Sequence, residues 1–278
     1  MRLFFSILNF FRPLNIFLGI LTLFVVSYLM DSTDFLRTMD LGIIIIFYMA
    51  GANSLNDLVD IEIDRINKPH RFLVQYPIKK KYIIFLILSL FFMGSWKALT
   101  ILPVAQNIAL FFVLPLLILY EIIFKKIPLL GNIIISLLVG SVFIYTEAGL
   151  TNNIVVTWKL FILAFILNLI REIIKDIQDI KGDHFNNITT LPIFIGLFPS
   201  IIFLRVLSLI FILVSFHPSY THQYSIYYIP LIFFSIHIPL LYIMWGLRVD
   251  ITTKKLNYFS NLLKIMIING IIIILLSH

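Results

Sequence analysis

Long apolar blocks alternate with short polar clusters along the whole chain. A helix needs roughly 20 apolar residues to cross the hydrocarbon core of a bilayer, and most of the blocks are about that long. The pattern predicts nine membrane-spanning helices, over residues 14–30, 41–58, 82–102, 107–124, 129–148, 157–176, 191–214, 226–246 and 259–277. We therefore expect an all-α polytopic membrane protein. Residues 1–278 should form a single domain, because the short loops leave no room for a soluble one.

Composition supports this class. Of the 278 residues, 60% are hydrophobic and 13% are charged, and the mean hydropathy is +1.03. Soluble domains are about 45–50% apolar and about 25% charged. A water-soluble fold of this chain would expose large apolar patches, so that class is excluded. The chain has no cysteine, which excludes disulfides, thiolate metal sites and thiol nucleophiles.

The net charge of +7 is explained by membrane topology rather than by a nucleic-acid partner. With a cytoplasmic N terminus, 14 Lys and Arg residues fall in cytoplasmic segments, and only Arg37, Lys97 and Lys159 fall outside. Basic residues are enriched on the cytoplasmic side of membrane proteins. No targeting peptide is evident, which agrees with a prokaryotic inner (plasma) membrane. The N terminus and the polar loops described next should then face the cytoplasm, and no obligate protein partner is evident.

The second predicted span ends in a polar run over residues 53–65. A helix advances about 100° per residue, so residues four apart lie one above the other on nearly the same face. Asn56, Asp60 and Asp64 therefore form a ladder of side-chain oxygens, whereas Glu62 points elsewhere.

A second acidic stripe ends the sixth predicted span. Glu172, Asp176, Asp179 and Asp183 share one face of a helix over residues 171–183, and isoleucines take most of the remaining surface. The two segments together hold eight of the chain's 14 acidic residues, on the same predicted side of the membrane.

Carboxylates near a bilayer are costly and repel one another unless a cation lies between them. Mg²⁺ prefers oxygen ligands and typically bridges one or two carboxylates to substrate phosphates. Two such helices facing each other would hold metal ions and a diphosphate between them. Cationic side chains close in sequence would neutralise the phosphate oxygens. These side chains are Arg65, Lys68, Arg71 and Lys175.

Several motifs resemble those of the UbiA superfamily of intramembrane prenyltransferases. The first acidic segment, from Asn56 to Arg71, resembles its first aspartate-rich motif, and Asp179-x-x-x-Asp183 resembles its second. Further matches are Arg12-Pro13-Leu14-Asn15, Tyr120 with Lys125, Thr190-Leu191-Pro192 and Gly196. One departure is Phe72, where the family commonly has proline.

The resemblance implies a nine-helix prenyltransferase bundle. It also implies Mg²⁺-dependent transfer of a polyprenyl group from its diphosphate to a lipid-soluble acceptor. Carried over to this chain, the metal ligands are Asn56, Asp60, Asp64, Asp179 and Asp183. The residues expected to contact the diphosphate are Arg65, Lys68, Arg71, Tyr120, Lys125 and Lys175. The residues expected to assist catalysis are Asp57, Asp176 and Lys175, the two acids either as proton acceptors or as hydrogen-bonding supports of the ligands.

The run from Arg171 to Asp179 resembles the geranylgeranylglycerol-phosphate geranylgeranyltransferases of ether-lipid synthesis more than the 4-hydroxybenzoate branch. We therefore expect a geranylgeranyl donor and geranylgeranylglyceryl phosphate as acceptor. Three alternatives stay open at this point: prenylation of an aromatic acid or quinone precursor, cyclisation of a single prenyl diphosphate, and cation transport along the acidic helices.

The sequence also predicts three local features. Gly182 should end the sixth helix, because glycine is common just past helix C-termini. Ser136 and Gly140 should let two helices pack closely. Lys175 should form an ion pair with Asp179, four residues further along the helix.

Overall fold

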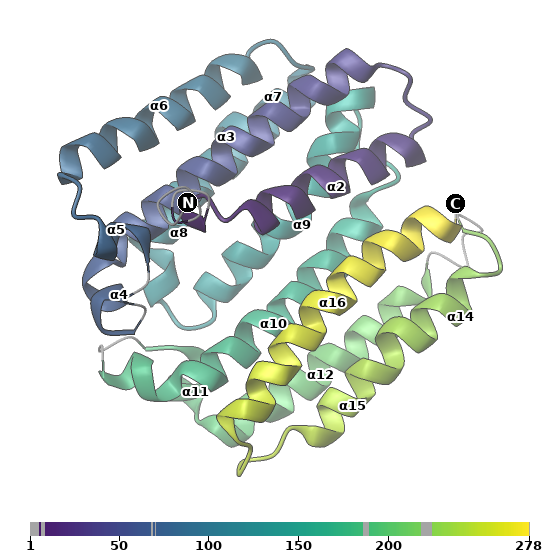
Figure 1. Ribbon diagram of the computed structural model, residues 1–278. Helices are drawn as coiled ribbons and strands as arrows, with labels where there is room; N and C mark the ends of the chain where they lie inside the picture. Colours follow the sequence, from purple (N-terminus) through teal and green to yellow (C-terminus); the bar gives the residue numbers. More distant parts are fainter. Residues whose placement is uncertain are drawn as a thin grey trace. The chain divides into compact units, whose positions relative to one another are not determined.

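The computed structural model describes residues 6, 9–67, 69, 71–185, 189–217 and 224–277, and in these ranges it contains helices, turns and loops (Figure 1). The helices of the first part are α2 (Pro13–Leu29), α3 (Phe35–Val59), α4 (Ile61–Asn67), α5 (Phe72–Gln75), α6 (Lys80–Ala98), α7 (Pro103–Asn107), η1 (Ile108–Val113), α8 (Leu114–Ile122) and η2 (Phe124–Lys126). Then follow α9 (Leu130–Thr151), α10 (Trp158–Phe185), α11 (Leu191–Ile195), α12 (Leu197–Ser215), α14 (Tyr228–Ile232), η3 (Phe233–His237), α15 (Ile238–Gly246) and α16 (Thr253–Ser277).

The predicted all-α membrane class is confirmed, and each predicted span overlaps one or more of the described helices. Among the described helices, seven are long and apolar enough to cross a membrane. The first predicted span corresponds to α2, which is apolar but has only 17 residues. The sixth corresponds to α10, which has 28 residues and carries the second acidic stripe.

Two of the membrane-length helices contain a π-helical turn in their middle. Residues Ile108–Val113 and Phe233–His237 adopt this conformation, and Pro115 and Pro239 are the second residues after these turns. Proline has no backbone N–H to donate, so the regular helical hydrogen bonding is interrupted before it. The wider π turn accommodates this interruption without ending the helix.

The chain forms two compact units. The first comprises Met1–Phe124 and Val142–Val155, and the second comprises Lys125–Ser141 and Val156–His278. Helix α9 thus contributes its first half to the second unit and its second half to the first.

In the first unit, α3 packs against α6 and α2 (Figure 1). Glycines allow helices of this unit to approach closely. A Cβ atom at Gly94 of α6 would lie 2.6 Å from the ring of Tyr48 on α3. A Cβ atom at Gly149 of α9 would lie 2.4 Å from Leu41 on α3. Small residues at helix contacts are typical of membrane proteins, because packing rather than water exclusion drives association there.

In the second unit, α10 packs against α16 and α12. The isoleucine face of α10 is buried in this core through Ile170, Ile173, Ile174 and Ile177. Burial of this face leaves the acidic stripe on the other side of the helix, as its amphipathic pattern predicts.

The structure of the second unit tests the predictions for Gly140 and Gly182. Gly140 packs against Phe161, since a Cβ atom there would lie 2.9 Å from that ring, so its packing role is confirmed. The prediction that Gly182 ends the helix is wrong, because α10 continues to Phe185. Glycine in a helix interior costs about 1 kcal/mol relative to alanine, which the remaining hydrogen bonds of a long helix tolerate.

Candidate functional site

The first acidic ladder lies where α3 meets α4. Asp60 is at the junction, with φ −89° and ψ 5°, so the predicted continuous helix is interrupted there. The backbone hydrogen bonds nevertheless keep the helical spacing: the Asp60 N–H donates to the Asn56 carbonyl at 2.9 Å, and the Asp64 N–H donates to the Asp60 carbonyl at 2.8 Å. The expected four-residue register of the ladder is therefore retained across the bend.

Arg12 reaches this ladder from the start of α2. It precedes Pro13 and adopts a left-handed backbone conformation, with φ 51° and ψ 64°. Proline disfavours the right-handed helical region for the residue before it. The Arg12 guanidinium donates to the side-chain oxygen of Asn56 and, at 2.8 Å, to Asp57 Oδ1.

Asp57 is the centre of a buried ion-pair cluster. Its side chain is 2% exposed. Besides Arg12, it accepts a hydrogen bond from Arg71 at 2.7 Å, and the Arg71 Nε lies 4.0 Å from Asp64 Oδ2. Arg71 was expected to contact the diphosphate, and the structure engages it with two carboxylates instead. This geometry favours a supporting role for Asp57 over proton transfer.

Glu121 of α8 is a site residue that the sequence analysis missed. It is buried, and its Oε2 accepts a hydrogen bond from the Asn56 amide at 2.8 Å. With the Arg12 contact on the other side, the Asn56 amide is oriented from both ends. The sequence did contain a signal for Glu121, because it is an acidic residue inside an apolar span and directly follows Tyr120. Acidic residues within membrane spans are candidates for functional residues by default.

The other residues predicted to contact the diphosphate differ in their exposure. Arg65 is exposed and pairs with Glu62 at 2.9 Å. Tyr120 and Lys125 are half-buried. Lys68 lies outside the described residues.

The second motif lies on α10, in the other unit. Asp176 Oδ2 accepts a hydrogen bond from the Asn132 amide of α9 at 2.9 Å. Asp183 is half-buried and Asp179 is exposed. Asn132 is a second residue that the sequence analysis missed, because an asparagine near the start of an apolar helix carries no signal without knowledge of its neighbour.

Glu172 is held by two cations of its own helix. Arg171 contacts its Oε1 at 2.6 Å, and Lys175 contacts its Oε2 at 2.7 Å. The structure thus shows an ion pair of Lys175 with Glu172, three residues before it, whereas the predicted partner was Asp179. Residues three apart on a helix are neighbours as much as residues four apart, so sequence spacing alone does not choose between them.

The oxygen donors of the first motif fit a hard divalent cation. Its candidate ligands are the amide oxygen of Asn56 and the carboxylates of Asp60 and Asp64, a ligand type that suits Mg²⁺. Asp57 Oδ2 is buried and has no hydrogen-bond partner in the part of the chain that the structure describes. Within the same residues, no three Asp, Glu or His side chains already form a compact metal-binding group.

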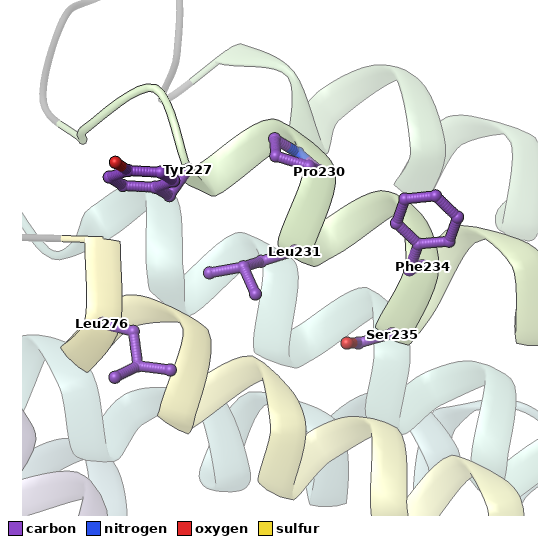
Figure 2. A pocket seen from close by; sticks show the side chains of 6 residues that line it. All are labelled: Tyr227, Pro230, Leu231, Phe234, Ser235 and Leu276. Atoms are coloured by element: carbon purple, nitrogen blue, oxygen red, sulfur yellow. The ribbon is translucent and has the colours of Figure 1, made fainter.

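Two pockets among the described residues contain none of the predicted site residues. One has a volume of about 440 Å³ and is lined by Tyr227, Pro230, Leu231, Phe234, Ser235 and Leu276 (Figure 2). The other, of about 400 Å³, is lined by Trp158, Lys159, Ile162, Leu163, Leu213, Val214 and His217. Mostly apolar linings provide few ligands for a metal or a diphosphate, so neither pocket is assigned to the chemistry.

Comparison with known proteins agrees with these motifs. Residues 16–265 match the model of the UbiA prenyltransferase family. The digeranylgeranylglyceryl phosphate synthase of Methanosarcina mazei is 39% identical over 170 residues, which cover 60% of this chain but only 57% of that protein. The enzyme of the same name from Methanosphaera stadtmanae is 30% identical over 223 residues, 80% of each chain.

Solved structures show the same fold. A structure described as digeranylgeranylglyceryl phosphate synthase in membranes has a TM-score of 0.82 at 28% identity, and covers 100% of this chain and 99% of its own. A UbiA homologue from Archaeoglobus fulgidus, bound to DMAPP and Mg²⁺, has a TM-score of 0.71 at 19% identity over 96% of this chain and 98% of its own. The superfamily resemblance of the motifs is confirmed: the chain belongs to the UbiA prenyltransferase family.

Proposed function

We propose that this protein transfers a geranylgeranyl group from its diphosphate to geranylgeranylglyceryl phosphate within a membrane. The observation that carries the proposal is the oriented oxygen ladder of Asn56, Asp60 and Asp64, to which Arg12 and Arg71 are tied through Asp57. The curated relatives support this choice of acceptor, because they carry the name digeranylgeranylglyceryl phosphate synthase.

In the proposed reaction, the bond between the allylic carbon and the diphosphate oxygen breaks, and its electron pair leaves with the diphosphate. The free hydroxyl oxygen of the acceptor forms the new ether bond to that carbon, and its proton passes to a base. Mg²⁺, when bound, neutralises the negative charge that develops on the leaving group. Each motif offers residues that would hold it: Asn56, Asp60 and Asp64 in the first, and Asp179 and Asp183 in the second.

The other residues of the chain support these steps. Arg12 and Glu121 fix the Asn56 amide so that its oxygen is presented in one orientation. Lys125, Arg65 and Lys68 are proposed to contact the diphosphate, since fixed cations stabilise a developing anion without reorganising. Asp176 is the proposed acceptor of the hydroxyl proton, with Asn132 holding one of its two carboxylate oxygens.

An assay of the purified full-length protein tests this function. Radiolabelled geranylgeranyl diphosphate and Mg²⁺ are supplied with geranylgeranylglyceryl phosphate or, separately, with 4-hydroxybenzoate. The proposal expects a doubly prenylated glyceryl phosphate from the first acceptor only, and loss of product when EDTA removes the metal. Product from 4-hydroxybenzoate alone would move the protein to the aromatic branch. Diphosphate release with neither acceptor would favour a cyclase, and no release from folded protein would overturn the enzyme proposal.

A further inference from the structure

Two cationic side chains contact one carboxylate in the second unit, and a third lies on the helix packed alongside. Glu172 of α10 accepts from Arg171 and Lys175 at 2.6 and 2.7 Å. Lys264 lies on α16, the helix packed against α10, within electrostatic range of all three residues. The next acid of the stripe, Asp176, is engaged with Asn132 of α9. The group of Arg171, Glu172, Lys175 and Lys264, here called the α10–α16 cluster, therefore carries more positive than negative charge.

The position of Lys264 is unusual for a lysine. It lies near the middle of the 25-residue apolar helix α16, far from either end, and it is exposed. Charged side chains inside membrane helices are rare and mark functional sites by default. Anchoring by basic residues at the membrane interface does not require one at this depth, because Lys254 and Lys255 already lie at the start of the helix.

The cluster also retains an unused donor. The Arg171 Nε is buried and has no hydrogen-bond partner in the described part of the chain. Glu172 accepts from Arg171 Nη1 and from Lys175 Nζ, and neither of its carboxylate oxygens accepts from the Arg171 Nε. An anionic ligand with several oxygens would supply the missing acceptors and balance the charge.

We infer that Arg171, Lys175 and Lys264 bind the phosphate group of the prenyl acceptor. The inference rests on the proposed function and names the residues that select its acceptor. It also reassigns Lys175, which the sequence analysis placed on the diphosphate. A phosphate monoester carries close to two negative charges at neutral pH, and arginine and lysine are its usual partners.

The location on α10 suits an acceptor. Lys175 lies four residues before Asp179, which corresponds to about 6 Å along the helix axis. The glycerol of the acceptor has three carbons, which carry the phosphate, the existing ether and the free hydroxyl. The free hydroxyl is only a few bonds from the phosphate. A phosphate bound at the cluster would thus place the hydroxyl near the second motif. An aromatic acid such as 4-hydroxybenzoate has no phosphate to use these donors.

The test compares Lys264→Gln with Lys254→Gln, which makes the same charge change at an exposed position on the same helix. Steady-state kinetics with varied acceptor and varied donor separate the two substrates. We expect Lys264→Gln to raise KM for geranylgeranylglyceryl phosphate about tenfold, with KM for the donor unchanged. Lys254→Gln should resemble the wild type. Arg171→Lys, which keeps the charge but loses the planar donor geometry, should show a smaller shift in the same direction.

Equilibrium binding of the acceptor, measured without the prenyl donor, tests the inference independently of turnover. Radiolabelled geranylgeranylglyceryl phosphate should bind the full-length wild type more tightly than geranylgeranylglycerol, and Lys264→Gln should remove most of this difference. If wild type forms product but neither KM nor binding changes in Lys264→Gln, the inference is overturned and the proposed function stands. If wild type forms no product, the proposed function fails, whereas phosphate-dependent binding lost in Lys264→Gln would still support the site. Absence of phosphate-dependent binding in wild type overturns the inference.

Discussion

Arg12 and Asp57 form an ion pair of 2.8 Å that ties the start of α2 to the end of α3, across 45 residues of sequence. The same Arg12 donates to Asn56, the first member of the oxygen ladder. Arg71 completes the arrangement from the segment that follows α4. Asp57 therefore organises three chain segments around the ladder, although its own carboxylate is almost inaccessible.

We predict that Asp57→Asn lowers both stability and turnover. Two arginines lose the negative charge that balances them, and breaking a buried ion pair costs about 3 kcal/mol. The thermal unfolding midpoint in detergent should fall, and so should prenyl transfer. If Asp57 only positions its neighbours, the remaining activity keeps the pH profile of the wild type. A changed profile would instead indicate proton transfer by this residue.

Glu62→Gln serves as the matched control for Asp57→Asn. The Glu62–Arg65 pair is 67% and 58% exposed, and exposed pairs contribute about 0–1 kcal/mol. Its loss should leave the unfolding midpoint near that of the wild type.

The ladder carboxylates should matter for chemistry more than for folding. Asp60→Asn is expected to reduce turnover about 100-fold, because it removes an oxygen donor from the site that stabilises the leaving group. Asp64→Asn, Asp179→Asn and Asp183→Asn should have effects of similar size. Turnover and inserted protein are measured together. Near-normal turnover in the Asp60 or Asp64 variant would contradict the assigned metal site.

Asn132 should support the second motif through Asp176. Asn132→Ala removes the hydrogen bond that holds one carboxylate oxygen of Asp176. We expect turnover to fall about tenfold, as for other residues that orient a functional side chain by hydrogen bonding to it. Asn132→Asp should be more harmful, because it places a second carboxylate against Asp176. Asn153→Ala, an exposed loop substitution, is the control. Equal activity of all three variants would exclude a role for this contact.

Two glycine substitutions should have opposite effects on stability. At Gly149, an added methyl group would overlap Leu41, and overpacking of this kind typically costs about 1–3 kcal/mol. At Gly182, an added methyl group would meet none of the described atoms outside its own stretch of helix within 4 Å, so Gly182→Ala should raise the free energy of unfolding slightly by favouring the helix. The unfolding midpoints of the two variants, each compared with that of the wild type, test both predictions. A stable Gly149→Ala protein would argue against the close packing of α9 on α3.

The sequence by itself determined the membrane class, the approximate spans and the family. These follow from local patterns: apolar runs of membrane length, a four-residue register of acids, and motif residues close together in the chain. The register survives even at the Asp60 bend, because it depends only on backbone hydrogen bonds between near neighbours.

Only the tertiary structure decided which side chains are partners. Arg12 with Asp57, Glu121 with Asn56, and Asn132 with Asp176 are separated by 45, 65 and 44 residues, so no local pattern contains them. Spacing also left open whether Lys175 pairs with Glu172 or Asp179, and whether Gly182 ends its helix. Ion pairs and helix ends depend on the neighbouring side chains in space. The packing of the helices brings these neighbours together, and the order of residues within one helix does not specify it.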